Sequence, residues 1–198
     1  MKYKIVLASN SKQRKDILNM IGLKYEVVVS DIDEDSDKKI PEEYVMELSK
    51  NKVMNVRKKI NSKRIIIGAD TIIYYNNKIY EKPKTKEKAY INLKDMSGNI
   101  TTAITGITIY DMYKDKIISF YDKCDIKFKK ISKEEINWYV NSEKNILSRC
   151  GYVILGKASL FLEKVNGDYN TLFGLSPSIL FSNLKKLGYD INDFEWIV

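Results

Sequence analysis

Two serines and an arginine stand where a strand pattern changes into a helix pattern near the start of the chain. In "LASNSKQRKDIL" (7–18), an apolar run is followed by Ser9, Ser11 and Arg14, and the helix pattern begins around them. The first N–H groups of a helix lack partners within the helix, and with the helix dipole they favour an anion. Hydroxyl and guanidinium donors suit phosphate oxygens. The segment predicts an anion site; the alternative is a capping Ser11 beside a solvated Arg14.

A carboxylate follows three isoleucines in "IIIGADT" (65–71). This pattern predicts a buried strand with Asp70 and Thr71 at its carboxyl end, where α/β folds bind their ligands. A carboxylate in that place is a natural ligand for Mg²⁺ or a base for a water molecule. The alternative is a turn or helix-capping residue.

Lysines and further carboxylates complete the set of candidate residues. Lys52 in "SKNKV", Lys82 in "YEKP" and the acidic run "DIDEDSD" (31–37) are each ordinary surface features when taken singly. Cations beside metal-binding carboxylates are, as a set, what the hydrolysis of a nucleoside triphosphate requires, because the enzyme must neutralise charge and orient water. The set comprises Ser9, Arg14, Lys52 and Lys82 as anion donors, and Glu34 and Asp70 as carboxylates.

The composition excludes several other chemistries. The chain of 198 residues has no histidine, which rules out Ser-His-Asp triads, Cys-His pairs and His-based zinc sites. Two cysteines, Cys124 and Cys150, are too few for a disulfide framework, and we expect both to be small buried residues in a reducing compartment. The formal net charge of +8 suits polyanions, but lysine-rich usage alone accounts for it.

Hydrophobic patterns in the first third of the chain predict an alternation of strands and helices. The run "KIVLAS" is continuous and apolar, as in strands buried on both faces. Lys52 is expected on a helix face turned toward other elements. The predicted order is a strand at 4–9, a helix stopped by Gly22, a strand at 24–31, a helix from Pro41 to 60 and a strand at 64–70.

The middle of the chain changes to β-branched and aromatic residues. Segments 99–111 and 116–131 predict a long antiparallel hairpin, and Ser132 with Glu135 predicts a capping box at the start of a helix. Later signals are a strand, a turn and a strand-like stretch over 159–175, then a helix capped by Ser176, opened by Pro177 and stopped by Gly188. We expect one α/β domain over 1–198 around a mixed β-sheet flanked by helices. The sequence does not decide whether this domain has one lobe or two.

Eight motifs occur in an order that resembles the Maf (septum-formation) family of nucleoside triphosphate pyrophosphatases. The match spans nearly the whole chain, and although each motif is weak alone, eight in register are specific. The motifs are "LASNSKQR", "DIDE", "YVMELSKNKV", "IIIGADT", "YEKP", "DMSG", "EEINWYV" and "GDYNTLFGLS".

The resemblance implies an elongated α/β fold shared with inosine triphosphate pyrophosphatases, usually in a homodimer. It also implies a divalent metal, Mg²⁺ or Mn²⁺, and release of pyrophosphate and a nucleoside monophosphate. Asp70 matches the family's catalytic proton acceptor. Glu34 matches a carboxylate near the metal. The matches to substrate and phosphate contacts are Ser9, Ser11, Arg14, Lys52 and Lys82.

Three positions match those that set base specificity in the family, namely Gln13, Thr71 and Leu155. The branch that cleaves dTTP and UTP has Arg, Thr and Gln there, whereas the branch acting on 7-methylguanosine triphosphate has Trp, Gln and Glu. This chain agrees with the first branch only at Thr71. Lys12 is expected to restore part of the charge missing at Gln13, without the planar fork of arginine.

We therefore expect a cytoplasmic, metal-dependent pyrophosphatase that acts on dTTP, UTP or modified pyrimidine nucleotides. No signal peptide, membrane span or nucleic-acid partner is expected. Two alternatives stay open: a preference for a modified or purine nucleotide, or a catalytically decayed protein that binds nucleotide or RNA.

Overall fold

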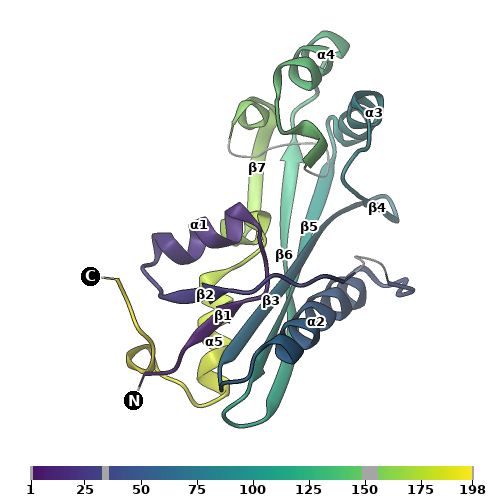
Figure 1. The fold of residues 1–198 in the computed structure, drawn as a ribbon. Helices are drawn as coiled ribbons and strands as arrows, with labels where there is room; N and C mark the ends of the chain where they lie inside the picture. Colours follow the sequence, from purple (N-terminus) through teal and green to yellow (C-terminus); the bar gives the residue numbers. More distant parts are fainter. Residues whose placement is uncertain (1, 33–35, 149–155, 198) are drawn as a thin grey trace. The chain divides into compact units, whose positions relative to one another are not determined.

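The computed structural model describes residues 2–32, 36–148 and 156–197, which form a mixed sheet flanked by helices (Figure 1). This confirms the predicted fold class. The strands are β1 (Ile5–Leu7), β2 (Tyr25–Val27), β3 (Ile65–Tyr75), β4 (Lys78–Tyr80), β5 (Ile100–Asp111), β6 (Lys116–Phe128) and β7 (Leu162–Gly167). The α-helices are α1 (Lys12–Met20), α2 (Pro41–Lys59), α3 (Lys86–Met96), α4 (Lys133–Ser142) and α5 (Pro177–Lys186). Among the described residues, no helix is long and apolar enough to cross a membrane.

The sheet combines parallel and antiparallel pairs. Its strand order is β2-β1-β3-β5-β6-β7, with β4 paired to β3. β1 runs parallel to both β2 and β3, while β4 and β7 are antiparallel to their partners β3 and β6. β5 and β6 are neighbours joined by a short turn, so the hairpin predicted from 99–131 is confirmed.

The described chain divides into two compact units. The first comprises residues up to 71, 105–122 and those from 173 onward, and the second comprises 72–104 and 123–172. The expectation of a single domain over 1–198 stays a prediction.

In the first unit, alternating side chains of β1 and β3 face different helices, because successive residues of a strand point to opposite faces. One face packs against α1 and α5, and the other packs against α2. The first cluster includes Ile5, Leu7, Ile65, Ile67, Leu18 and Leu184. The second cluster includes Val6, Ala8, Ile66, Val53 and Val56. The last described residues run beside the start of the chain, where the Tyr3 N–H donates to the Asp193 carbonyl at 2.8 Å (Figure 1).

The second unit carries α3, α4, β4 and β7. Cys124 is fully buried there on β6, as expected, and Cys150 lies outside the described residues. The Ser132–Glu135 capping box at α4 is present in both directions, which confirms that prediction. Ser176 likewise caps α5 by accepting from the Ile179 N–H.

The strand-like prediction for 169–175 is wrong at its start, because Tyr169–Phe173 is a 3-10 helix. The Asp168 side chain accepts from the Asn170 N–H at 2.8 Å, and its carbonyl accepts from the Thr171 N–H at 3.0 Å. Such a local side-chain bond offers the backbone a turn in place of a strand ladder. The β-branched and aromatic content of the segment therefore did not decide its conformation.

Candidate active site

A buried ion pair joins α2 to β3. Lys52 Nζ lies 2.6 Å from Asp70 Oδ1, and both residues are more than nine-tenths buried. Lys52 comes from the helix face that also carries Val53 and Val56, so the helical periodicity that forms the core also directs this ammonium inward. A charge removed from water needs an opposite charge close by. The structure thus brings together two of the residues singled out from the sequence.

Two glycines let α2 approach the sheet closely enough for this pair to form. A Cβ at Gly106 of β5 would lie 2.4 Å from the carbonyl of Val45, and a Cβ at Gly68 of β3 would lie 2.7 Å from the carbonyl oxygen of Ser49. At Gly106 the obstacles are helix backbone atoms, which cannot rotate away; at Gly68 the Ser49 carbonyl is joined by Cγ2 of Val53 at 2.6 Å. The helix and the sheet therefore touch backbone to backbone at both points, next to the residues that carry the ion pair.

The position of Asp70 differs from the sequence prediction. It was expected at the carboxyl end of a strand, but it is the sixth of eleven residues in β3, and the strand continues to Tyr75. The β-branched and aromatic residues after Thr71 sustain the strand, and its last residues pair with β4. Pairing with β1 nevertheless ends at Ile67, so Asp70 does lie beyond the parallel-paired part of β3.

A second cluster surrounds the guanidinium of Arg14, which is 8% exposed. Arg14 Nη1 donates to Ser9 Oγ at 3.1 Å, Nη2 donates to Thr71 Oγ1 at 3.2 Å, and Nε donates to the carbonyl of Gly174 at 3.0 Å. The alternative of a solvated Arg14 is therefore wrong. Gly174 has a φ of +88°, and a Cβ there would lie 2.8 Å from Thr71 Oγ1 and 3.1 Å from Arg14 Nε.

The two clusters use opposite faces of β3. Asp70 faces α2 and bonds Lys52, whereas the next residue, Thr71, bonds Arg14 of α1. This follows from the two-residue period of a strand. In the first unit, the anion donors expected to act together are thus divided into a Lys52–Asp70 pair and a Ser9–Arg14–Thr71 group.

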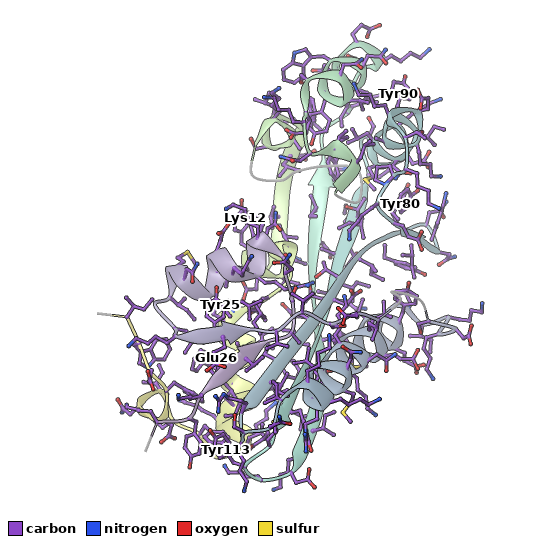
Figure 2. All side chains as sticks on the ribbon, in the orientation of Figure 1. Lys12, Tyr25, Glu26, Tyr80, Tyr90 and Tyr113 are labelled. Atoms are coloured by element: carbon purple, nitrogen blue, oxygen red, sulfur yellow. The ribbon has the colours of Figure 1, made fainter. Side chains whose placement is uncertain are left out.

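Ser11 and Gln13 lie at the beginning of α1 and bond each other, with Ser11 Oγ 3.2 Å from Gln13 Oε1. Ser11 is the N-cap residue, but its side chain makes no capping bond, so the capping alternative is wrong for that side chain. Lys12, labelled in Figure 2, forms an exposed ion pair of 2.6 Å with Asp16. The charge proposed to compensate for Gln13 is therefore engaged one turn along the helix.

Lys82 belongs to the second unit, where it is exposed and lines an open cavity of about 380 Å³. Asn92 also lines this cavity; its amide oxygen is buried and has no hydrogen-bond partner among the described residues. Tyr80, labelled in Figure 2, lines it too and donates to Asp95 at 3.2 Å. Burial, then the charge and hydrogen bond of Asp95, raise the pKa of Tyr80 to about 12. Three further lysines line the cavity, namely Lys78, Lys84 and Lys88.

Two expected site residues, Glu34 and Leu155, lie outside the described residues. Within the described ranges, no group of three or more Asp, Glu or Cys side chains is arranged to hold a metal ion. Mg²⁺ commonly uses one or two carboxylates together with substrate phosphates and waters, and does not need an all-protein cage. Asp70, a carboxylate among the described residues of this site, fits that mode of binding.

Comparison with known sequences agrees with the motifs. The sequence model of the family described as "Maf-like protein" matches residues 4–187. This chain belongs to that family. The resemblance inferred from the eight motifs is thereby confirmed.

The Maf-like chain is similar over almost its whole length to proteins named dTTP/UTP pyrophosphatase. One from Thermoanaerobacter sp. (strain X514) is 41% identical over 92% of this chain and 96% of the relative. Another, from Clostridium perfringens (strain SM101 / Type A), is 36% identical over 95% of this chain and 98% of the relative. A solved HAM1 protein from Coxiella burnetii aligns with a TM-score of 0.46 at 12% identity, covering 64% of this chain and 73% of that one.

Sequence reasoning missed two residues that touch the Arg14 cluster. Gly174 accepts from Arg14, and Thr105 of β5 lies 2.9 Å from Thr71 between their hydroxyl oxygens. The alternation of "AITGIT" around Thr105 indicates its strand but not its partner across the sheet. Contacts between neighbouring strands depend on register, which a single sequence does not reveal.

Proposed function

We propose that this Maf-like protein hydrolyses pyrimidine nucleoside triphosphates, of the dTTP and UTP class, to a nucleoside monophosphate and pyrophosphate. The observation that carries the proposal is the buried Lys52–Asp70 pair in a chain 41% identical to a relative named dTTP/UTP pyrophosphatase. A buried carboxylate held by one ammonium is costly to maintain for stability alone. A reaction that needs a fixed base accounts for it.

In the proposed reaction, a water molecule attacks the α-phosphorus. The bond from that phosphorus to the oxygen bridging to the β-phosphorus breaks, and the bridging oxygen leaves with pyrophosphate. Lys52 holds Oδ1 of Asp70, so the carboxylate keeps one orientation, and Oδ2 accepts the proton from water. Histidine, which the chain lacks, is not needed for this step.

Ser9 and Arg14 orient the nucleotide in this proposal. The guanidinium is already fixed by three bonds, so little side-chain freedom is lost when a ligand binds nearby. Ser11 and Lys82 are further proposed substrate contacts, and Gln13, Thr71 and Leu155 the proposed base-selecting positions. The lysines around Lys82 supply positive charge that suits a polyphosphate.

Asp70, together with Glu34, is proposed to hold a divalent metal, Mg²⁺ or Mn²⁺. When bound, the metal neutralises phosphate charge and makes a coordinated water more acidic. The cytoplasmic location and the homodimer also stay predictions. Size-exclusion chromatography tests the second of them, because it reports the oligomeric state.

The first experiment is turnover of a nucleotide panel with Mg²⁺: UTP, dTTP, CTP, purine triphosphates, and methylated and deaminated bases. Pyrophosphate release, fastest with UTP or dTTP, is expected. Release of orthophosphate would contradict the proposed reaction. A preference for purine or modified bases would instead assign a changed specificity to Gln13 and Leu155. Binding of RNA without turnover would contradict the proposal and support the alternative of a catalytically decayed binding protein.

The second experiment separates the base from the phosphate contact. Asp70→Asn is expected to keep nucleotide binding but to lose turnover by roughly 10²–10⁴-fold, as removal of a catalytic base usually does. Lys82→Ala is expected to weaken both affinity and turnover, because it removes a cation from the proposed polyphosphate site. Asp16→Asn, on the exposed face of α1, is the matched control and leaves both unchanged. If folded Asp70→Asn turned over at the wild-type rate, the proposed mechanism would be abandoned.

A further inference from the structure

Thr105 carries a buried hydroxyl next to Thr71, one of the proposed base-selecting positions. It lies on β5, is 0% exposed, and its Oγ1 is 2.9 Å from Oγ1 of Thr71 on the neighbouring strand β3. A ligand cannot touch a side chain that no solvent reaches. Thr105 can therefore affect the substrate only indirectly, and its contact with Thr71 supplies one such route.

Thr71 links this buried hydroxyl to Arg14. Its Oγ1 accepts from Arg14 Nη2 at 3.2 Å, and an oxygen with two lone pairs and one proton has capacity left for Thr105. The chain of contacts is thus Thr105, Thr71, Arg14 and then Ser9. Hydrogen bonds in such chains restrict the rotamers of their members, because rotating one hydroxyl breaks two bonds.

We propose that Thr105 is a positioning residue for substrate selection: its hydroxyl fixes the χ1 rotamer of Thr71 and, through it, the orientation of the Arg14 guanidinium. The inference rests on the proposed function, since Thr71 and Arg14 must face the nucleotide. It adds a residue that no sequence motif pointed to. Thr105 touches neither substrate nor metal in this role.

The test compares three variants on the same strand. Thr105→Val removes the hydroxyl and keeps the shape, while Thr105→Ser keeps the hydroxyl. Thr101→Val is the matched control: Thr101 is also 0% exposed on β5, but its Oγ1 has no hydrogen-bond partner within the described part of the chain. For each folded variant, KM, kcat and the preference for UTP over CTP are measured.

Thr105→Val is expected to raise the KM for UTP and lower the preference over CTP by about 3- to 10-fold, the size of one typical hydrogen bond. Thr105→Ser and Thr101→Val are expected to stay within about 2-fold of wild type. An unchanged Thr105→Val, or a Thr105→Ser that is equally impaired, would overturn the inference.

A second readout does not need activity. The Arg14 Nε–H, which donates to the Gly174 carbonyl, should exchange with water faster by NMR in Thr105→Val but not in the other two variants. If the wild-type protein neither binds nor cleaves a triphosphate, the proposed function fails, and the exchange rate still reports whether Thr105 orders Arg14. Equal exchange rates in all variants would reject the positioning role while leaving the proposed function intact.

Discussion

Breaking the Lys52–Asp70 pair should be expensive because water cannot replace the lost partner. The side chains are only 8% and 11% exposed. Lys52→Met leaves a buried carboxylate without its counter-charge, a change that costs about 3–5 kcal/mol of unfolding free energy at fully buried sites. The remaining contact with water places the expected cost near the lower end of that range.

The double variant Lys52→Met/Asp70→Asn removes both charges and should be more stable than Lys52→Met alone, because no uncompensated ion is left. Urea unfolding, followed by circular dichroism and by tryptophan fluorescence, gives the free energies of unfolding for a complete double-mutant cycle.

The chain offers a matched control in Lys12 and Asp16. Their atoms are also 2.6 Å apart, but the side chains are 79% and 55% exposed. The same substitutions there should show a coupling of about 0.2–1 kcal/mol, as exposed pairs do. If the buried pair showed no more coupling than this control, burial would not set its strength, and the reasoning about a fixed base would fail.

Two further predictions concern a glycine and a tyrosine. Gly174→Ala and Gly188→Ala, at φ of +88° and +83°, should each lower the free energy of unfolding by about 1–2 kcal/mol, measured by thermal unfolding. Only Gly174→Ala should also raise KM, because its Cβ would meet Thr71 and Arg14. An equal effect of the two substitutions on KM would refute this prediction. Tyr80, with its pKa raised to about 12, stabilises the fold below the pKa of about 10 of an unfolded tyrosine, and this contribution is lost as pH rises from 10 toward 12. Tyr80→Phe should therefore flatten the fall in unfolding free energy measured by urea titration over that range, and an unchanged slope would contradict it.

Local signals predicted the elements well wherever one residue type fixes one conformation. Pro41 opens α2, the Ser132–Glu135 box opens α4, and Ser176 caps α5, because each acts on backbone atoms within a few residues. The same locality explains the miss at 169–173, where the side chain of Asp168 closed a helical turn that propensity did not indicate.

The candidate site was predicted in its parts but not in its arrangement. The sequence singled out Lys52 and Asp70, yet it did not show that they form one pair while Arg14 bonds Thr71 on the opposite face of β3. That division depends on strand length and register, which are set by tertiary packing. The contribution of Thr105 was missed for the same reason, since its contact with Thr71 joins residues 34 apart in the chain.

The two backbone contacts of α2, at Gly68 and Gly106, make position 52 selective for side-chain length. The helix cannot move nearer to the sheet, because backbone atoms already touch there, and moving it away would open a void beside each glycine. A shorter cation at this position would fall short of Asp70, and the bulkier arginine would have to displace the helix. The spacing between α2 and the sheet is thus fixed, and the length of a lysine side chain matches it.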